Sequence, residues 1–87
     1  MVYSGNTFNI SNLEVIQGYL EAYGFFKVDA VDKVFLRPGE YVYYYWLSGS
    51  AGRAFASVVP TANGRRFNVW VYFKDGEKRH HEFYIPF

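Results

Sequence analysis

The chain has 87 residues, of which 51% are hydrophobic and 23% aromatic, and its formal net charge is +1. This length allows one small domain over residues 1–87 and excludes a second one. The chain has no cysteine, which excludes disulfides, thiolate metal sites and cysteine nucleophiles. So many rings in so small a body cannot all be buried, and we expect several of them on the surface.

The N-terminal stretch MVYSGNTFNIS has no basic segment followed by an apolar one. No apolar run in the chain approaches the roughly 18 residues of a membrane span. We therefore expect a soluble protein without a targeting signal and without a membrane partner. The lack of cysteine favours a cytoplasmic location.

A helix is predicted over about residues 12–23. Ser11 and Glu14 have the S-x-x-E spacing of a capping box, in which each side chain satisfies a free backbone N–H of the first turn. Apolar residues then recur at helical spacing, and Gly24 suits the left-handed position after the last turn.

After Gly24 the pattern alternates in the way typical of strands, and we expect sheet over about residues 25–85. The connections are too short for parallel crossovers, which favours antiparallel pairing of neighbours. The predicted fold class is therefore α+β, with one N-terminal helix packed on a five- to six-stranded antiparallel meander sheet. The predicted strands cover 25–30, 33–37, 40–48, 53–60, 65–73 and 77–85.

Asn63-Gly64 is the strongest hairpin signal in the chain. A two-residue turn there pairs Val58 with Val69, and the alternate residues around this pair are all apolar. This face of the two strands has the composition of a core layer.

The following turn falls near Gly76 and allows two registers. A two-residue turn would place His80 on the apolar layer. A three-residue loop over 74–76, with its glycine in the left-handed position of a bulge, pairs Phe67 with Phe83 instead. A slip of one residue moves every side chain to the other face, so we favour the loop that keeps the layer apolar.

The opposite face of the last three strands then has aromatic rings fringed by cations. We expect Trp70 beside His80 and Tyr72 beside Lys78, with Glu82 as the only acidic member. Rings on which bases stack, flanked by cations that hold phosphates, are typical of sheets that bind single-stranded nucleic acid. The candidate binding residues are Arg53, Phe55, Arg66, Trp70, Tyr72, Lys74, Lys78, His80 and Tyr84.

Two uses of this face stay open beside a purely structural one. The first is a non-enzymatic module that binds single-stranded nucleic acid. The alternative is homodimerisation, or binding of a protein partner, through the same rings. The strand YVYYYWLS at 41–48 is apolar on both sides, which favours a central position in the sheet.

No catalytic or metal-binding motif accompanies this pattern. His80 and His81 are neighbours on a strand and point to opposite faces, and His80 with Glu82 supplies only two ligands. We therefore expect no enzymatic activity, no metal and no cofactor.

The segment FLRPGEYVYYYWL resembles the turn-and-strand segment of RelE-type RNA-cleaving toxins, whose pattern is R-x-G-x-Y-R-V-x-Y. Arg37, Gly39 and Tyr41 stand in matching places, whereas Val42 replaces the arginine that follows the tyrosine. The family also places a helix or helical hairpin before its sheet. As a minority alternative, the resemblance implies an RNA-cleaving enzyme that performs acid–base chemistry with side chains of the sheet.

Overall fold

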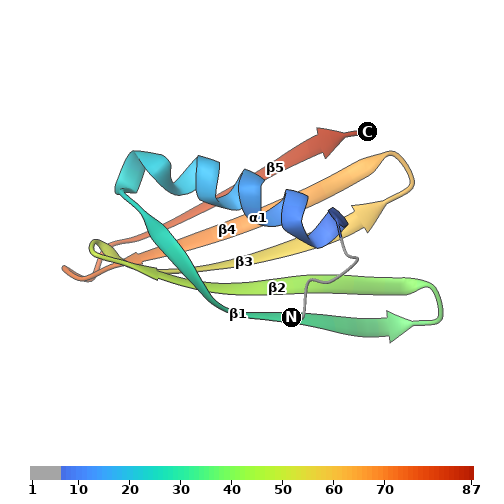
Figure 1. Cartoon of the computed structure of the whole chain (residues 1–87), viewed down its shortest axis with the longest axis horizontal. Coiled ribbons are helices and arrows are strands. Elements are labelled where there is room, and N and C mark those ends of the chain that lie inside the picture. Colours follow the sequence, from blue (N-terminus) through green and yellow to red (C-terminus); the bar gives the residue numbers. More distant parts are fainter. Residues whose placement is uncertain (1–6) are drawn as a thin grey trace.

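The computed structural model of the chain describes residues 7–87 and shows one helix and a five-stranded antiparallel sheet, an α+β arrangement (Figure 1). Residues 1–6 lie outside the described residues. They belong to the N-terminal stretch in which we expect no targeting signal. No helix in the described part of the chain is long and apolar enough to cross a membrane.

The helix α1 spans Thr7–Leu20 and continues as a 3-10 turn over Glu21–Tyr23. The predicted start near residue 12 is wrong, because Ser11 lies inside the helix and its hydroxyl accepts a hydrogen bond from Arg65 Nη1 (3.3 Å). The predicted end is close, and Gly24 has the expected positive φ of 110°. Its N–H donates to the carbonyl of Glu21 (3.1 Å) and closes the last turn.

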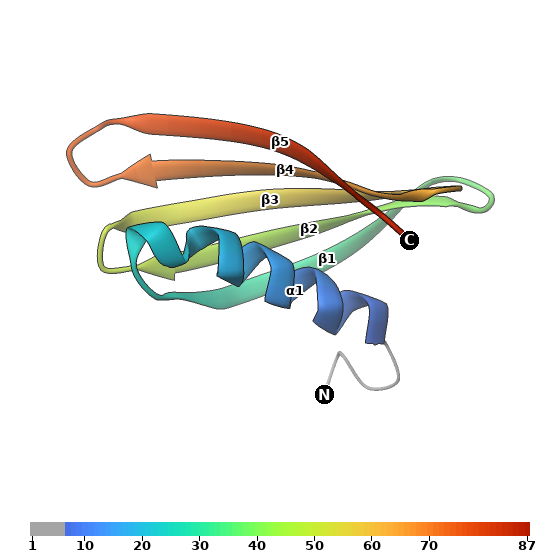
Figure 2. The same ribbon diagram turned by 90° about the horizontal axis from the view of Figure 1, so that it is seen from above.

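The five strands pair in chain order, each antiparallel to the next, so the sheet is a meander (Figures 1 and 2). The strands are β1 (Phe26–Arg37), β2 (Glu40–Gly49), β3 (Gly52–Thr61), β4 (Gly64–Phe73) and β5 (Lys78–Pro86).

The predicted separation of the strands 25–30 and 33–37 is wrong. Both ranges belong to β1, in which Asp29 is an extra residue between Val28 and Ala30, and these two pair with consecutive residues of β2. A bulge of this kind interrupts the alternation without ending the strand. The sheet therefore has five strands and not six. In the sequence, the bulge interrupts the alternation in the same way that a turn does.

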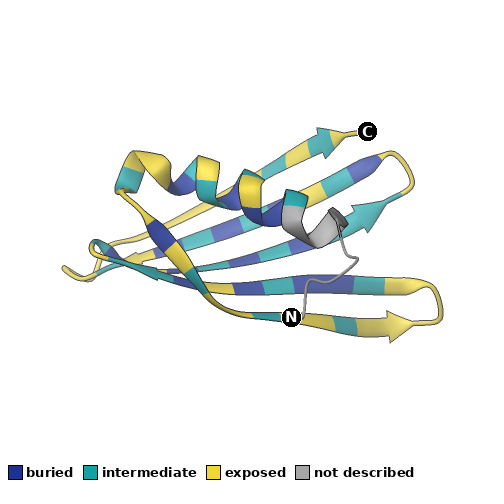
Figure 3. Ribbon diagram, in the orientation of Figure 1, coloured by how far each residue is buried: buried dark blue, intermediate teal, exposed yellow. Residues whose placement is uncertain are grey.

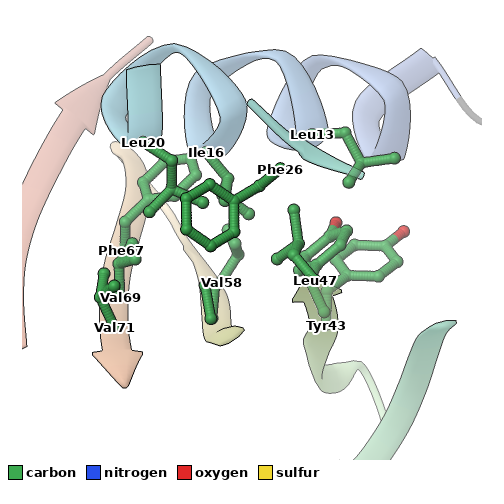
Figure 4. Close-up of a cluster of buried hydrophobic side chains, with 13 residues drawn as sticks. Leu13, Ile16, Leu20, Phe26, Tyr43, Leu47, Val58, Phe67, Val69 and Val71 are labelled. Atoms are coloured by element: carbon green, nitrogen blue, oxygen red, sulfur yellow. The ribbon is translucent and has the colours of Figure 1, made fainter. Parts of the chain in front are cut away.

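The face of the sheet that α1 crosses is here called the inner face (Figures 1 and 2). Leu13, Ile16 and Leu20 of α1 lie in one buried cluster with side chains of this face (Figure 4). Figure 3 shows buried residues on α1 and on the strands that it crosses. The cluster members from the sheet are Phe26, Tyr43, Tyr45, Leu47, Ala54, Ala56, Val58, Phe67, Val69 and Val71.

Polar side chains also connect α1 to the sheet. The amide of Asn12 is fully buried, donates to the hydroxyl of Tyr45 (3.0 Å) and accepts from Arg65 Nη1 (2.6 Å). Gln17 Nε2 donates to the carbonyl of Phe26 (3.1 Å). Buried amides need such partners because they have lost their water. These bonds join the helix to β1, β2 and β4.

The turn between β3 and β4 lies one residue earlier than predicted. Thr61 pairs with Gly64, so the turn residues are 62 and 63. Gly64 is the first residue of β4. A side chain there would collide with the carbonyl of Ile85 and lie 2.7 Å from Pro86 Cα. The glycine is required for the close approach of β5 and not for the turn itself.

The pairing between β3 and β4 consequently differs from the prediction by two residues, with Val58 opposite Phe67 instead of Val69. Because the side-chain period of a strand is two, this shift leaves every residue on its predicted face.

The predicted three-residue loop between β4 and β5 is confirmed. Gly76 has a φ of 96°, its N–H donates to the carbonyl of Phe73 (3.0 Å), and the N–H of Phe73 donates to the carbonyl of Glu77 (2.8 Å). Phe67 pairs with Phe83 as expected, and their rings stack with centroids 5.0 Å apart. The loop thereby fixes which residues of β5 share a face with β4.

Candidate functional site

The face of the sheet turned away from α1 is here called the outer face. Val69 and Val71 of β4 belong to the buried cluster, and neighbouring residues of a strand point to opposite faces. Trp70 and Tyr72 therefore point outward.

Aromatic rings from four strands form a continuous row across the outer face. Trp46 of β2 pairs with Phe55 of β3, Phe55 with Trp70 of β4, and Trp70 with His80 of β5. Successive ring centroids are 5.3, 5.6 and 4.6 Å apart, and the planes of Trp70 and His80 differ by only 10°. Tyr44 stacks on Phe55 from the next pairing row (5.6 Å). These five residues are called the ring platform.

The ring platform is open to solvent to different degrees. Trp46 is 41% exposed and His80 is exposed, whereas Tyr44, Phe55 and Trp70 are half-buried. The half-buried rings are partly covered by the other rings of the row. Contacts between aromatic cross-strand neighbours contribute roughly 0.2–1 kcal/mol each.

A second row, next to the ring platform, is cationic. Arg53 pairs with Tyr72 and Tyr72 with Lys78, as the sequence predicted for the latter pair. All three side chains are exposed. Within residues 7–87 no carboxylate lies within ion-pair distance of Arg53 or Lys78. These charges are available to an anionic ligand.

The opposite end of the outer face is a polar network in which the charges are shared. Arg66 Nε lies 3.9 Å from Glu82 Oε2, and Asn68 donates to the same oxygen (3.4 Å). Asn68 Oδ1 lies 2.8 Å from Nε2 of His80. Tyr84 pairs with Arg66. Arg66 is therefore a weaker anion site than Arg53.

Lys74 is placed differently from the other predicted site residues. It lies in the loop over 74–76, where its N–H donates to the carbonyl of Ala51 (3.1 Å) and the residue is exposed. Its charge is at the end of the sheet and outside the cross-strand rows.

A hollow of about 420 Å³ opens on the outer face beside the ring platform. Its lining includes Asp29, which is the bulge residue of β1. Lys27 Nζ lies 3.7 Å from this carboxylate. The other residues that line the hollow from β2, β3 and β4 are Trp46, Arg53, Phe55 and Tyr72, together with Leu47 and Ala54, whose side chains belong to the inner cluster.

The sequence pattern did not predict that Tyr44, Trp46 and Asp29 belong to this site. The predicted strands 40–48 and 53–60 leave residues 49–52 as a loop, but Gly49 pairs with Gly52, so β2 and β3 form a tight hairpin. Counting alternate residues outward from that turn would have placed Trp46 beside the predicted ring of β3. The bulge residue could not be located in the same way, because a bulge has no fixed signature.

The outer face is also less positive than the last three strands alone predicted. Glu82 is the acidic member contributed by those strands, and β1 adds Asp29 and Asp32, the latter paired with Tyr44. Arg53 therefore shares the hollow with the carboxylate-bearing residue Asp29, whereas Lys78 lies outside its lining.

The two neighbouring histidines point to opposite faces, as expected. His80 stacks on Trp70, whereas the ring of His81 lies 5.1 Å from that of Tyr19 on the inner side. Burial, together with the neighbouring Tyr23 hydroxyl, raises the pKa of Tyr19 to about 12. In the described residues, no three or more His, Asp or Glu side chains gather in a way that could hold a metal ion.

The residues that match the RelE-type pattern lie at the far end of the β1–β2 hairpin, away from the hollow. Arg37 Nε lies 2.9 Å from Glu40 Oε1 across the exposed turn, and Gly39 has a φ of 80°. The ring of Tyr41 packs between those of Phe35 and Tyr43 on the inner side. These residues are thus separate from the ring platform.

The sequence matches no protein-family model, and searches found no similar curated protein or solved structure. The function is therefore inferred from the geometry of the site. Its three features are the row of rings, the exposed cations beside it and the hollow between them.

Proposed function

We propose that the chain is a non-enzymatic binding module that holds single-stranded nucleic acid on the outer face of its sheet. The observation that supports this most strongly is the unbroken row of Trp46, Phe55, Trp70 and His80 across four strands. Every base has a π face, and stacking on an aromatic side chain contributes roughly 1–3 kcal/mol per base without regard to sequence.

The width of the row suits a short segment of nucleic acid. Four strands spaced about 4.8 Å apart extend over roughly 15 Å. Four-stranded RNA-binding sheets stack two or three bases over a comparable width. We expect the ring platform to hold a similar number.

The cations are arranged to hold the phosphates of such a segment. Arg53 and Lys78 are exposed beside the platform and form no ion pair within the described part of the chain, and Lys74 lies in the adjoining loop. Phosphate contacts release counterions, so the affinity should fall as the salt concentration rises.

A titration of the protein with a short oligouridylate tests the proposal. We expect quenching of tryptophan fluorescence and a rise in oligonucleotide anisotropy at low salt. Arg53→Gln and Lys78→Gln should each reduce the slope of log K against log salt by about 0.7, the value for one phosphate contact on a single strand. Unchanged emission and anisotropy at low salt would contradict the proposal.

Arg79→Gln is the matched control for Lys78→Gln. The two residues are adjacent, but Arg79 pairs with Val71 on the inner side and lies 3.8 Å from Glu77. Its removal should leave the salt slope unchanged. Recovery of the oligonucleotide intact supports a non-enzymatic module, whereas its cleavage would favour the RelE-type alternative.

Self-association through the same face is the second candidate function. Trp46, Tyr72 and Tyr84 are 41%, 43% and 44% exposed, and exposed aromatic residues on one face are typical of protein interfaces. Sedimentation equilibrium distinguishes the two functions. A dimer would have twice the monomer mass of 10.2 kDa, and Trp70→Ala should return it to monomer.

A further inference from the structure

The hollow has a lining that suits one flat ring. Arg53 and Phe55 line it from β3, Trp46 from β2 on one side, and Tyr72 from β4 on the other. Its volume of about 420 Å³ is near the lower end of the range of ligand sites. It therefore suits a single base better than a larger ligand.

Asp29 reaches the hollow because of the bulge in β1. As the extra residue between Val28 and Ala30, it has no partner on β2 and is released from the regular alternation. Bulges often redirect a side chain next to a functional site. This bulge places a carboxylate in the lining of a hollow that is otherwise aromatic and cationic.

The carboxylate of Asp29 retains the capacity to accept hydrogen bonds. Its only ion pair within the described residues is with Lys27, at 3.7 Å through Oδ1, and the side chains are 70% and 42% exposed for Lys27 and Asp29. An ionised carboxylate has about four acceptor sites. Oδ2 is therefore open to a ligand, and the long contact of Oδ1 can be shared with one.

A carboxylate discriminates among the bases by the donors that they offer. Guanine presents two adjacent donors, N1–H and the N2 amino group, which match the two oxygens of one carboxylate. Adenine and cytosine present one amino group beside a ring nitrogen that accepts, and uracil presents one N–H between two carbonyls. In those three bases an acceptor faces the second carboxylate oxygen.

The negative charge of Asp29 also favours a base that offers donors. A carboxylate repels the phosphates of any nucleic acid, so Asp29 weakens binding unless it receives donors from a base. Arg53, in the same hollow, can donate to the acceptors O6 and N7 of guanine or to a phosphate.

We propose that the hollow is a guanine-selective subsite in which Asp29 accepts hydrogen bonds from the N1–H and N2 amino groups of a base held between Trp46 and Tyr72. This inference rests on the proposed binding of single-stranded nucleic acid. It adds a base preference to a surface that would otherwise bind bases by stacking alone.

Four fluorescein-labelled heptamers test the subsite: UUUGUUU, UUUIUUU with inosine, UUUAUUU and UUUUUUU. A single central guanine avoids the association of guanine-rich strands. Wild-type protein should bind the guanine heptamer about tenfold more tightly than the adenine heptamer. The inosine heptamer should fall between them, because inosine has N1–H but lacks the amino group.

Asp29→Asn should remove this preference, because the amide presents one acceptor and one donor where two acceptors are needed. Asp32→Asn is the matched control: it lies on the same strand and face but does not line the hollow, and it should keep the tenfold preference. Circular dichroism checks that both variants fold.

The outcomes separate the inference from the function on which it rests. Equal binding of the guanine and adenine heptamers, or a preference that survives Asp29→Asn, would overturn the guanine subsite while leaving binding by stacking intact. Failure of all four heptamers to bind would overturn both.

Discussion

Tyr45 and Tyr72 lie on opposite faces of the same sheet and differ in their burial. Tyr45 is fully buried and its hydroxyl accepts a hydrogen bond from Asn12, whereas Tyr72 is 43% exposed. The neighbouring arginines differ in the same way, because Arg65 bonds to the buried amide of Asn12 and Arg66 forms an exposed ion pair. The position of a residue relative to α1, and not its type, determines whether it stabilises the fold or stays available to a ligand.

Strand β3 shows how the two faces are made from one segment. Its inner residues Ala54 and Ala56 are small and lie in the buried cluster that includes α1. The outer residue between them, Phe55, has no helix to accommodate and packs sideways against rings of the neighbouring strands. Within β3, the large ring therefore lies on the outer face and the small residues lie on the inner face.

The largest expected effect is on the free energy of unfolding, and it differs between variants of the inner and outer faces. Phe67→Ala removes a fully buried ring of the inner face, which should lower the free energy of unfolding by about 3–5 kcal/mol. Trp70→Ala, on the outer face of the same strand, should lower it by roughly 1 kcal/mol because it loses mainly cross-strand ring contacts. Urea unfolding measures both, with Phe67→Leu as a milder core variant. Equal losses would contradict the assignment of the faces.

The next effect compares two amides. Asn12→Ala removes the buried link between α1 and the sheet and should cost about 1–3 kcal/mol. Asn68→Ala removes exposed hydrogen bonds on the outer face and should cost no more than about 0.5 kcal/mol. A double-mutant cycle of Asn12→Ala with Tyr45→Phe should give a coupling of at least about 0.5 kcal/mol. Zero coupling would show that this hydrogen bond does not hold the helix.

A smaller effect, of opposite sign, is expected in the helix. Gly18 lies within α1 and is exposed, and a methyl group on its Cα would meet no other heavy atom within 4 Å beyond its own helix backbone and chain neighbours. Gly18→Ala should raise the free energy of unfolding by about 0.5–1 kcal/mol, because alanine loses less backbone entropy in a helix. This variant is also a stabilised background in which outer-face variants can be compared. A loss of stability would mean that the position contacts another part of the protein.

The smallest effect on the free energy of unfolding is expected from the titration of Tyr19 on the inner side. Burial raises the pKa of this phenol to about 12, above the ordinary value of 10. The unfolded chain therefore loses the proton first, and the stability that is fully present below pH 10 is lost progressively between pH 10 and 12. Unfolding of Tyr19→Phe in this range should depend less on pH than that of the wild type. Identical pH profiles would contradict the raised pKa.

Much of the fold follows from alternation and turn chemistry. The loop over 74–76 was predictable because only that register keeps Phe67 and Phe83 on the apolar layer. The start of α1 was not, because the Ser11 hydroxyl bonds to Arg65, a residue 54 positions away. A local capping pattern cannot compete with a tertiary partner that the sequence does not show.

The site was predictable where a register could be counted. Trp70 and His80 follow from one turn, whereas the glycine- and serine-rich SGSAG stretch gives no register for Trp46, because it resembles a long loop more than a tight turn. Asp29 depends on a bulge, which inserts one residue at a place that hydrophobic alternation alone does not mark. Gly64 is a special position, as its hairpin signal indicates, but the reason is the approach of β5.

The most direct test of ligand binding on the outer face uses the two tryptophans of the chain, Trp46 and Trp70. Both belong to the ring platform, so their indole N–H signals in an ¹H–¹⁵N NMR spectrum report on that face. Titration with oligouridylate at low salt should move both signals, while backbone signals of the inner-face residues Val58 and Val69 move little. Indole signals that stay fixed at saturating oligonucleotide, or that move only with protein concentration, would contradict nucleic-acid binding by the ring platform.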